Sequence, residues 1–342
     1  MKSNTSIETL HNYHQMIKNL EPAKRVKLKE LLGITVDDEQ RLVGLDNEDE
    51  FAVIVYALGW VKSFTGVEEG IAQVTKTKTT DLFVETVQGR KISIEIKSSK
   101  KHEIEFTHKL IQDKQHFSEE HGHECYFAIK LAGHWMLFSS SYIIKNGYKI
   151  SLEKDYLKSE MNEIFGERFF LFPKGLEIVT TYSKSKESIC GIVNEYGNAI
   201  RIAIKTNGKR KFLITSHNDS NTFVSIVLES LENTMSNQSQ SVSHVDADKT
   251  IVIEKLTENL YVTMSSILTA PILHTIDAKF GEKYSFQTYL EEIKKGGHNL
   301  LERKLVLATL SLFDEEYQIA MSINNTDFYW IRDLMMDEEK CD

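Results

Sequence analysis

The sequence predicts a mixed α/β domain over about residues 46–150, followed by a further α+β region that runs to residue 342. Two observations carry this prediction. Between residues 46 and 150, segments of helical and strand periodicity follow each other in the order helix, strand, strand, helix, strand, strand. Beyond residue 187, short alternating segments are separated by Asn-containing and Gly-containing turns. Because 41% of the residues are hydrophobic and 27% are charged, the composition excludes wholesale disorder.

The N-terminal part is predicted to be helical. Apolar residues recur at helical spacing over residues 6–32, Pro22 marks a break, and Gly33 is a suitable C-cap. We interpret residues 1–45 as a helical arm. A second helix is predicted over residues 47–58, and Gly59 ends it.

The next segments predict two hairpins around a helix. Residues 81–86 and 91–97 read as strands joined by a turn at Gln88-Gly89. Residues 110–120 are predicted to be helical, and the strands 125–130 and 135–138 are joined by a turn at Gly133.

The C-terminal half predicts a different organisation. Residues 187–215 read as a three-stranded meander, and a helix follows over residues 222–235. A Ser-, Asn- and Gln-rich stretch predicts a linker at residues 236–249, which separates a domain at 151–235 from a last region at 250–342. That last region is expected to hold a β pair within residues 251–264 and helices at 285–295 and 300–313.

Several features bear on the compartment. The N-terminus lacks a basic start followed by an apolar core, so we expect no secretory signal. The longest apolar runs, residues 51–60 and 305–313, are shorter than the ~20 residues that span a bilayer. The 3 cysteines have no motif spacing. We therefore expect a cytoplasmic protein without a membrane segment.

The residues that indicate chemistry are Asp81, Glu95 and Lys97. Glu95 and Lys97 are two positions apart on a strand, so both side chains leave the same face, opposite to the isoleucines between and beside them. Since position 88 lies midway between 81 and 95, a hairpin that turns at Gln88-Gly89 would place Asp81 opposite Glu95.

Two carboxylates held close together repel each other unless a cation lies between them. Oxygen ligands of this kind suit Mg²⁺ or Mn²⁺. A lysine on the same face could orient or deprotonate a metal-bound water, so the set predicts metal-assisted phosphodiester hydrolysis. Alternating Glu and Lys is also typical of an ordinary solvated strand, which is the competing interpretation.

An Asp, 13 intervening residues and then Glu-x-Lys on the second strand of a hairpin resembles the PD-(D/E)XK nuclease superfamily. Thr80 stands where that superfamily usually has proline. The stretch from Phe117 to Phe138 is similar to the archaeal Holliday-junction-resolvase branch, and restriction endonucleases share the same core. The resemblance covers roughly residues 46–140, about a third of the chain.

This resemblance implies a restriction-endonuclease-like mixed sheet flanked by helices. It assigns metal binding to Asp81, Glu95 and the main-chain carbonyl of Ile96, and it assigns positioning of the attacking water to Lys97. An acid on the preceding helix, Glu50 with Glu48 as its rival, would bind a second metal. A glutamine on the following helix would touch the substrate phosphate or orient Lys97. The resemblance thus implies the catalytic residues Asp81, Glu95, Lys97, Glu50 and Gln115, with Gln112 as an alternative to Gln115.

The charge pattern does not exclude DNA as the substrate. The net charge is -9, yet residues 76–114 hold nine basic and six acidic residues. We predict that lysines and one glutamine of this segment contact nucleic acid, although a solvated surface would look the same. These residues are Lys76, Lys78, Lys100, Lys101, Lys109, Gln112 and Lys114.

Two further patterns have open interpretations. Five basic residues surround the Asn207-Gly208 turn, and such a ribbon could enter a DNA groove or merely protect a sheet edge from aggregation. The segment His121-Gly122-His123-Glu124-Cys125 could hold a soft metal, but a polar loop that leads into a strand is the simpler interpretation.

We therefore expect a Mg²⁺-dependent or Mn²⁺-dependent DNA endonuclease that acts as a homodimer. The nearly 200 residues after the core favour a restriction or defence-type enzyme, and they could also bind a partner protein. The alternatives are a Holliday-junction-resolvase-like nuclease and a non-catalytic module that binds nucleic acid or a partner. The sequence also leaves an RNA substrate open.

Overall fold

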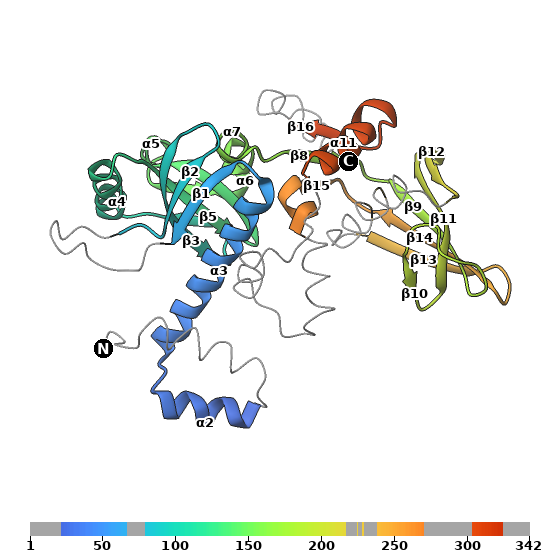
Figure 1. Cartoon of the computed structure of the whole chain (residues 1–342), viewed down its shortest axis with the longest axis horizontal. Helices are drawn as coiled ribbons and strands as arrows, with labels where there is room; N and C mark the ends of the chain where they lie inside the picture. The colour runs from blue at the N-terminus through green and yellow to red at the C-terminus, as the bar shows by residue number, and fades with distance from the viewer. Residues whose placement is uncertain are drawn as a thin grey trace, which may run out of the picture. The chain divides into compact units, whose positions relative to one another are not determined.

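A computed structural model describes residues 22–66, 79–216, 224, 228, 238–269 and 303–323. The chain forms two compact units (Figure 1). The first comprises residues 1–166 and 274–299, and the second comprises residues 167–273 and 300–342.

The first unit is built on one five-stranded sheet. Its strands are, in spatial order, β1 (Val61–Gly66), β2 (Leu82–Thr86), β3 (Lys91–Ser99), β5 (Glu124–Leu131) and β6 (His134–Ser139). β3 and β5 are parallel, whereas the other neighbours are antiparallel. The predicted mixed sheet is therefore confirmed, and β1 is an additional edge strand that the sequence analysis did not identify.

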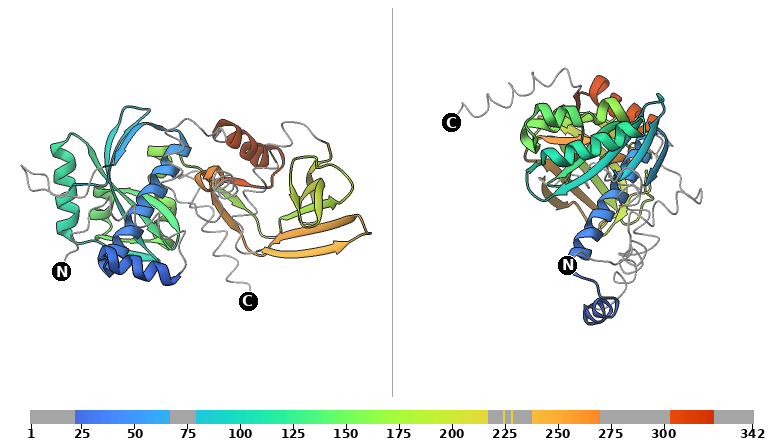
Figure 2. Two further views of the ribbon diagram at one scale, coloured as in Figure 1. Left: turned by 60° about the horizontal axis from the view of Figure 1, so that its bottom comes forward. Right: turned by 90° about the vertical axis from the view of Figure 1, so that its left-hand side faces the viewer.

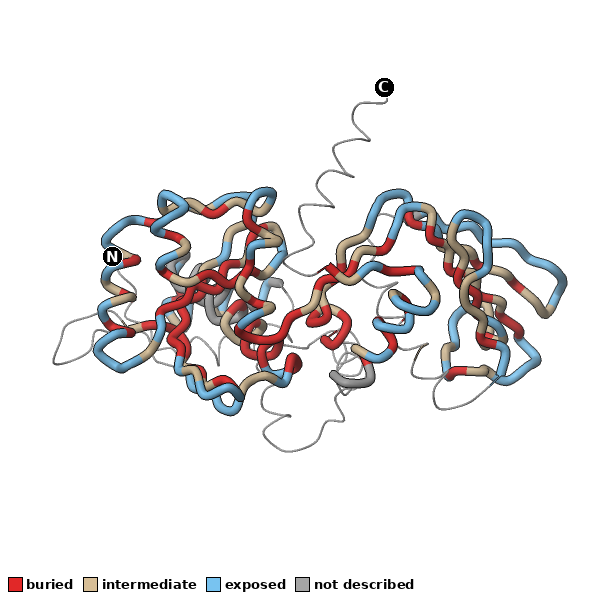
Figure 3. The backbone as a smooth tube through the Cα atoms, turned by 90° about the horizontal axis from the view of Figure 1, so that it is seen from above, coloured by how far each residue is buried: buried red, intermediate tan, exposed pale blue. Residues whose placement is uncertain are grey.

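Helices cover both faces of this sheet. α3 (Val36–Leu58) packs on the face of β3 that carries its isoleucines, and the predicted helix at residues 47–58 is the C-terminal half of α3. α4 (His108–Glu120) and α5 (Ser140–Lys145) pack on the opposite face, against a core that includes Phe127 and Phe138. The sheet is consequently buried on both sides (Figure 3).

The first unit also contains several shorter elements. Pro22 begins α2 (Pro22–Leu32), and proline is well suited to the first turn of a helix. The helix predicted before Pro22 lies outside the described residues. Gly33 follows α2 with φ 65°, as the C-cap prediction requires. The remaining elements are β4 (Glu103–Glu105), which pairs with β7 (Lys149–Ser151), together with α6 (Leu152–Asp155), η1 (Tyr156–Lys158) and α7 (Met161–Phe165).

The second unit contains a larger antiparallel sheet, whose ribbons are visible in Figure 2. Its strands are, in spatial order, β10 (Val193–Asn194), β11 (Gly197–Thr206), β9 (Glu177–Ser183), β14 (Lys249–Leu256) and β13 (Gln238–His244), and β12 (Lys209–Ile214) also pairs with β11. The predicted three-stranded meander is confirmed, since β10 pairs with β11 and β11 pairs with β12. β11 also pairs along most of its length with β9, which lies before the predicted range.

The predicted linker at residues 236–249 is wrong for most of its length. β13 lies within it and pairs with β14 from Gln238 to His244. An edge strand with solvated side chains needs no apolar alternation, so its Ser- and Gln-rich sequence resembles a linker.

A small sheet completes the described part of the second unit. It consists of β15 (Leu260–Thr263), β8 (Phe169–Phe172) and β16 (Met321–Ile323). β14 and β15 were expected to form a pair, but they belong to different sheets. α11 (Arg303–Ser311) and η2 (Leu312–Glu316) correspond to the predicted helix at residues 300–313. The helices predicted at 222–235 and 285–295 fall almost entirely outside the described residues.

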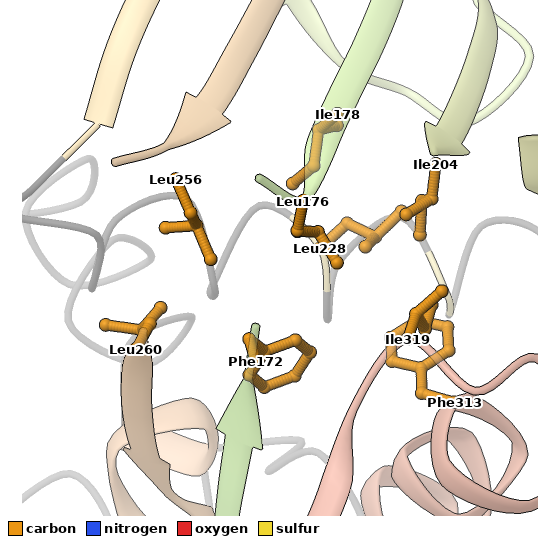
Figure 4. Close-up of a pocket in the computed structure, with 9 residues that line it drawn as sticks. All are labelled: Phe172, Leu176, Ile178, Ile204, Leu228, Leu256, Leu260, Phe313 and Ile319. Carbon is orange, nitrogen blue, oxygen red and sulfur yellow. The ribbon is translucent and has the colours of Figure 1, made fainter. Parts of the chain in front are cut away.

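A small pocket lies within the second unit, beneath the ends of β9, β11 and β14 (Figure 4). Every side chain that lines it is apolar, so it offers no group for acid–base or metal chemistry. The lining residues are Phe172, Leu176, Ile178, Ile204, Leu228, Leu256, Leu260, Phe313 and Ile319. Across the described segments, no helix has the length and apolar character needed to cross a bilayer.

Candidate active site

The β2–β3 hairpin brings Asp81 and Glu95 together as the sequence predicts. Leu82 pairs with Ile94 and Phe83 pairs with Ser93, so the register is centred on position 88. The Asp81 amide donates a hydrogen bond to the Ile94 carbonyl at 3.0 Å. The Ile96 amide in turn donates to Asp81 Oδ2 at 2.6 Å, which fixes the carboxylate beside the strand. The predicted hairpin geometry is therefore confirmed.

Glu95 and Lys97 lie on the same side of β3. This side is not an open surface, as it would be in an ordinary solvated strand. Glu95 is only 2% exposed and Asp81 is 8% exposed, because α4 covers this face. Lys97 Nζ contacts Glu95 Oε1 at 2.6 Å, and the Lys97 side chain is 36% exposed. The carboxylates are therefore interior groups, and Lys97 lies at the solvent-facing side of the cluster.

The two carboxylates influence each other electrostatically. Burial, followed by repulsion from Glu95, raises the pKa of Asp81 from 3.8 to about 6. The Ile96 amide, Lys97 and Lys114 act in the opposite direction. Such a site favours either a proton or another cation close to Asp81.

Lys114 is the residue of this site that the sequence analysis misplaced. It was predicted to line a phosphate-facing groove, yet it is 6% exposed. Its Nζ contacts Glu95 Oε2 at 2.5 Å and donates a hydrogen bond to the Thr79 carbonyl. The buried residues of α4 are Ile111, Lys114, Phe117 and Ser118. This helical spacing was visible in the sequence, and it places Lys114 on the buried face of α4.

The two glutamines of α4 lie elsewhere. Gln112 is exposed, and the Gln115 amide donates to Glu119 Oε1 at 2.9 Å on the helix surface. Of the polar side chains between positions 112 and 115, the structure brings Lys114 to Glu95.

Glu50 is also separated from the carboxylate pair. Its Oε2 contacts Lys130 Nζ at 2.5 Å, and its Oε1 accepts a hydrogen bond from Trp135 Nε1 at 2.9 Å. Lys130 pairs with Ser98, which shares the face of β3 opposite to Glu95 and Lys97. Because α3 covers that opposite face, neither Glu50 nor its rival Glu48 joins the cluster around Glu95.

The remaining predicted residues do not extend the cluster. Lys100, Lys101 and Lys109 are exposed, while Lys76 and Lys78 lie outside the described residues. His121 and His123 pack around Phe83 and Phe117. That aromatic packing agrees with the simpler interpretation of the His121–Cys125 segment.

The side chains around Asp81 and Glu95 offer few donors to a metal ion. No group of three or more His, Cys, Asp or Glu side chains suited to a metal occurs within the described part of the chain. Asp81 and Glu95 supply two carboxylates. The Ile96 carbonyl points to the same side of β3 as the Ile96 amide, which bonds Asp81. Glu95 Oε2 accepts no well-aligned hydrogen bond among the described residues, although Lys114 contacts it. These oxygens fit a hard divalent cation, which would replace the contact of Lys97 or Lys114 with the Glu95 carboxylate.

Comparison with known proteins gives little further information. No protein-family model matches the sequence, and no curated protein matches it. Among solved structures, the chain is similar to Hjc of Archaeoglobus fulgidus, a Holliday junction resolvase from an archaeal hyperthermophile. The two are 20% identical, and the match has a TM-score of 0.26 and covers 31% of this chain and 87% of that chain. A likeness with so low a TM-score assigns no function to this chain.

Proposed function

We propose that the first unit is a metal-dependent endonuclease that hydrolyses phosphodiester bonds in DNA. The supporting observation is the buried pair Asp81–Glu95, held beside the partly exposed Lys97 on the β2–β3 hairpin. An ordinary solvated strand does not bury two carboxylates side by side, because each loses hydration and repels the other.

Each residue has a distinct role in this proposal. The carboxylates of Asp81 and Glu95 and the carbonyl of Ile96 would hold Mg²⁺ or Mn²⁺. Such a metal, when bound, lowers the pKa of a coordinated water and neutralises charge on the phosphate. Lys97, at the solvent-facing side, would position the attacking water and stabilise negative charge that develops on the phosphate.

Lys114 is assigned a positioning role. Its ammonium bridges Glu95 and the Thr79 carbonyl, so it connects α4 to β3 and to the chain just before Asp81. This contact holds the Glu95 carboxylate in place beside Asp81. Neither Glu50 nor the two α4 glutamines is given a catalytic role, because their contacts lie elsewhere.

Within this class, a restriction or defence-type enzyme is the leading proposal. The second unit contributes a sheet of its own, which a minimal nuclease does not need. Symmetric cutting of both DNA strands would require a homodimer, and a cytoplasmic location remains our expectation. A junction-resolving nuclease is the alternative within the class, and a non-catalytic binding module is the alternative outside it.

The test is a cleavage panel. The purified full-length chain is incubated with linear duplex DNA, a four-way junction, single-stranded DNA and RNA, each with Mg²⁺, Mn²⁺ or EDTA. We expect cleavage of DNA with either metal and none with EDTA. Preferential cutting of the four-way junction would favour the resolvase alternative.

The decisive variants are Asp81→Asn and Lys97→Ala. Glu85→Gln is a matched control, because Glu85 is an acid on β2 that is paired with Lys62 away from the cluster. Metal-dependent cleavage retained by Asp81→Asn would refute the proposal, as would an unaltered rate in Lys97→Ala.

A further inference from the structure

The β11–β12 hairpin of the second unit has an unusual charge. Residues 197–214 contain five cationic and no acidic residues, although the whole chain has a net charge of -9. Asn207 and Gly208, with φ 49° and 72°, form the two-residue turn that fixes the pairing of the two strands. The cationic residues are Arg201, Lys205, Lys209, Arg210 and Lys211.

Two of these cations face each other directly. Lys205 of β11 pairs with Arg210 of β12, and directly opposed residues of an antiparallel pair have Cβ atoms only about 4.5–5.5 Å apart. Like charges in such positions repel and destabilise the pair. The hairpin therefore places two positive charges where a bound anion would relieve their repulsion.

The neighbouring strands do not neutralise them. On its other side, Lys205 pairs with Glu177 of β9, and Glu177 pairs in turn with Lys255 of β14. In this row of four residues across β12, β11, β9 and β14, Glu177 is the only acid. Lys255 of β14 binds Glu177 Oε1 at 3.1 Å. The row thus contains three cations and one acid, and Arg201 lies on the same face of β11 as Lys205.

Ala203 and Ser183 are buried on this sheet face, whereas its other side chains are half-buried or exposed. Val179, Thr181, Ile251 and Ile253 are half-buried, in contrast to Ile178, Ile202 and Val252 on the core face. The edge strand β13 adds three exposed hydroxyl groups in register with them. Arginine, lysine and hydroxyl side chains are the groups that most often bind phosphate oxygens of nucleic acids.

We propose that this face binds the sugar–phosphate backbone of a nucleic acid through Arg201, Lys205 and Arg210. The inference deepens the proposed function, on which it rests for the identity of the bound polymer as the nuclease substrate. The binding itself needs no metal, so it can be measured apart from cleavage.

The experiment measures the binding of the full-length chain to fluorescently labelled duplex and single-stranded DNA by anisotropy, in EDTA and over a range of NaCl concentrations. The test variant is Lys205→Gln/Arg210→Gln. The matched control is Lys184→Gln/Lys186→Gln, which removes two exposed lysines of the second unit that lie outside this row. We expect the test variant to bind roughly tenfold more weakly and to lose about 2 from the slope of log K against log[NaCl]. The control should change affinity less than about twofold.

A second variant, Arg210→Glu, separates binding from folding. It places an acid opposite Lys205, so the hairpin should be as stable as in the wild type or more stable, while DNA affinity falls by a similar factor because the charge again changes by about 2. If the cations only protect the sheet edge from aggregation, affinity will be unchanged in both variants, which overturns the inference. Absence of wild-type binding to either DNA at low salt overturns it as well.

The two proposals fail in distinguishable ways. If Asp81→Asn loses cleavage but binds DNA as the wild type does, the result supports the proposed nuclease activity. It does not bear on the hairpin, which the binding variants test separately. Conversely, if the wild type binds DNA through the hairpin and yet cleaves no substrate, the result would support the proposed binding face and refute the proposed nuclease activity.

Discussion

The two main sheets of this protein use charged residues in opposite ways. The first sheet is covered on both faces and encloses Asp81, Glu95 and Lys114, whose charges have little contact with water. The second sheet buries one face and carries Lys205, Arg210 and Lys255 on the other. Charges enclosed by protein interact strongly and shift pKa values, whereas exposed charges are screened by water and salt. Substitution of a charged residue should therefore change activity or stability strongly in the first sheet and change stability little in the second.

The largest expected effect follows from Asp81→Asn. This substitution keeps the size of the side chain and an acceptor for the Ile96 amide, but it removes one carboxylate of the pair. We expect cleavage to fall by about 10³-fold or more, because metal binding and charge stabilisation are both lost. Initial rates with Mg²⁺ measure this effect, and Glu85→Gln should keep the wild-type rate.

Lys97→Ala should have the next largest effect on activity. Loss of one positioned charged donor typically lowers a catalytic rate by about 10²–10³-fold. Because the Lys97 side chain is 36% exposed and Lys114 still contacts Glu95, its removal should cost less thermal stability than Lys114→Met. Single-turnover cleavage together with thermal denaturation checks both parts. A large loss of stability would mean that Lys97 is mainly structural.

Lys114→Met should reduce stability more than any of the exposed lysine substitutions. It leaves Glu95 buried with one cationic partner fewer, and breaking a buried ion pair typically costs ~3–5 kcal/mol. Urea denaturation measures the loss. The double variant Lys114→Met/Glu95→Gln removes the unbalanced charge and should recover much of the stability. Additive effects of the two substitutions would contradict a direct interaction.

The pKa of Asp81 predicts a smaller, pH-dependent effect on stability. Its folded-state pKa, about 6, lies above the ordinary 3.8, so the folded protein holds the proton more tightly than the unfolded chain. The stabilisation from that proton is complete below pH 3.8 and is lost as the pH rises through about 6. The metal-free Asp81→Asn variant should therefore gain stability over the wild type across this window, reaching at most roughly 3 kcal/mol above it.

At neutral pH, bound metal should reverse the difference in stability between the wild type and Asp81→Asn. Mg²⁺ would occupy the place of the missing proton, so it should raise the thermal midpoint of the wild type but not that of Asp81→Asn. Equal responses of the two proteins to Mg²⁺ would show that the carboxylate pair does not bind the ion. Differential scanning calorimetry with and without EDTA gives both midpoints.

The smallest effect is expected for Lys255→Gln in the second sheet. Its ion pair with Glu177 spans 3.1 Å, and the Lys255 side chain is 50% exposed. Pairs of this kind contribute roughly 0–1 kcal/mol and weaken with salt. Urea denaturation at low and high salt should give nearly the same stability for variant and wild type. A loss like that of Lys114→Met would contradict the contrast between the two sheets.

Local patterns in the sequence sufficed for the hairpin of the candidate active site. Strict alternation over residues 91–97 and the Gln88-Gly89 turn determine the register, and the register alone places Asp81 opposite Glu95. The periodicity of α4 could also have identified Lys114 as an interior residue. In both cases the determining interactions lie within a few residues along the chain, where spacing is informative.

Glu50 and β13 required the tertiary structure. Glu50 lies on a correctly predicted helix, yet only the packing of α3 decides which face of the sheet it covers. β13 has a sequence typical of a linker and becomes a strand because β14 supplies its hydrogen-bond partners. The sequence by itself thus determined β2, β3, their turn and the opposed carboxylates, because these depend on local periodicity. Only the tertiary structure decided which charges are buried together, because burial depends on elements distant along the chain.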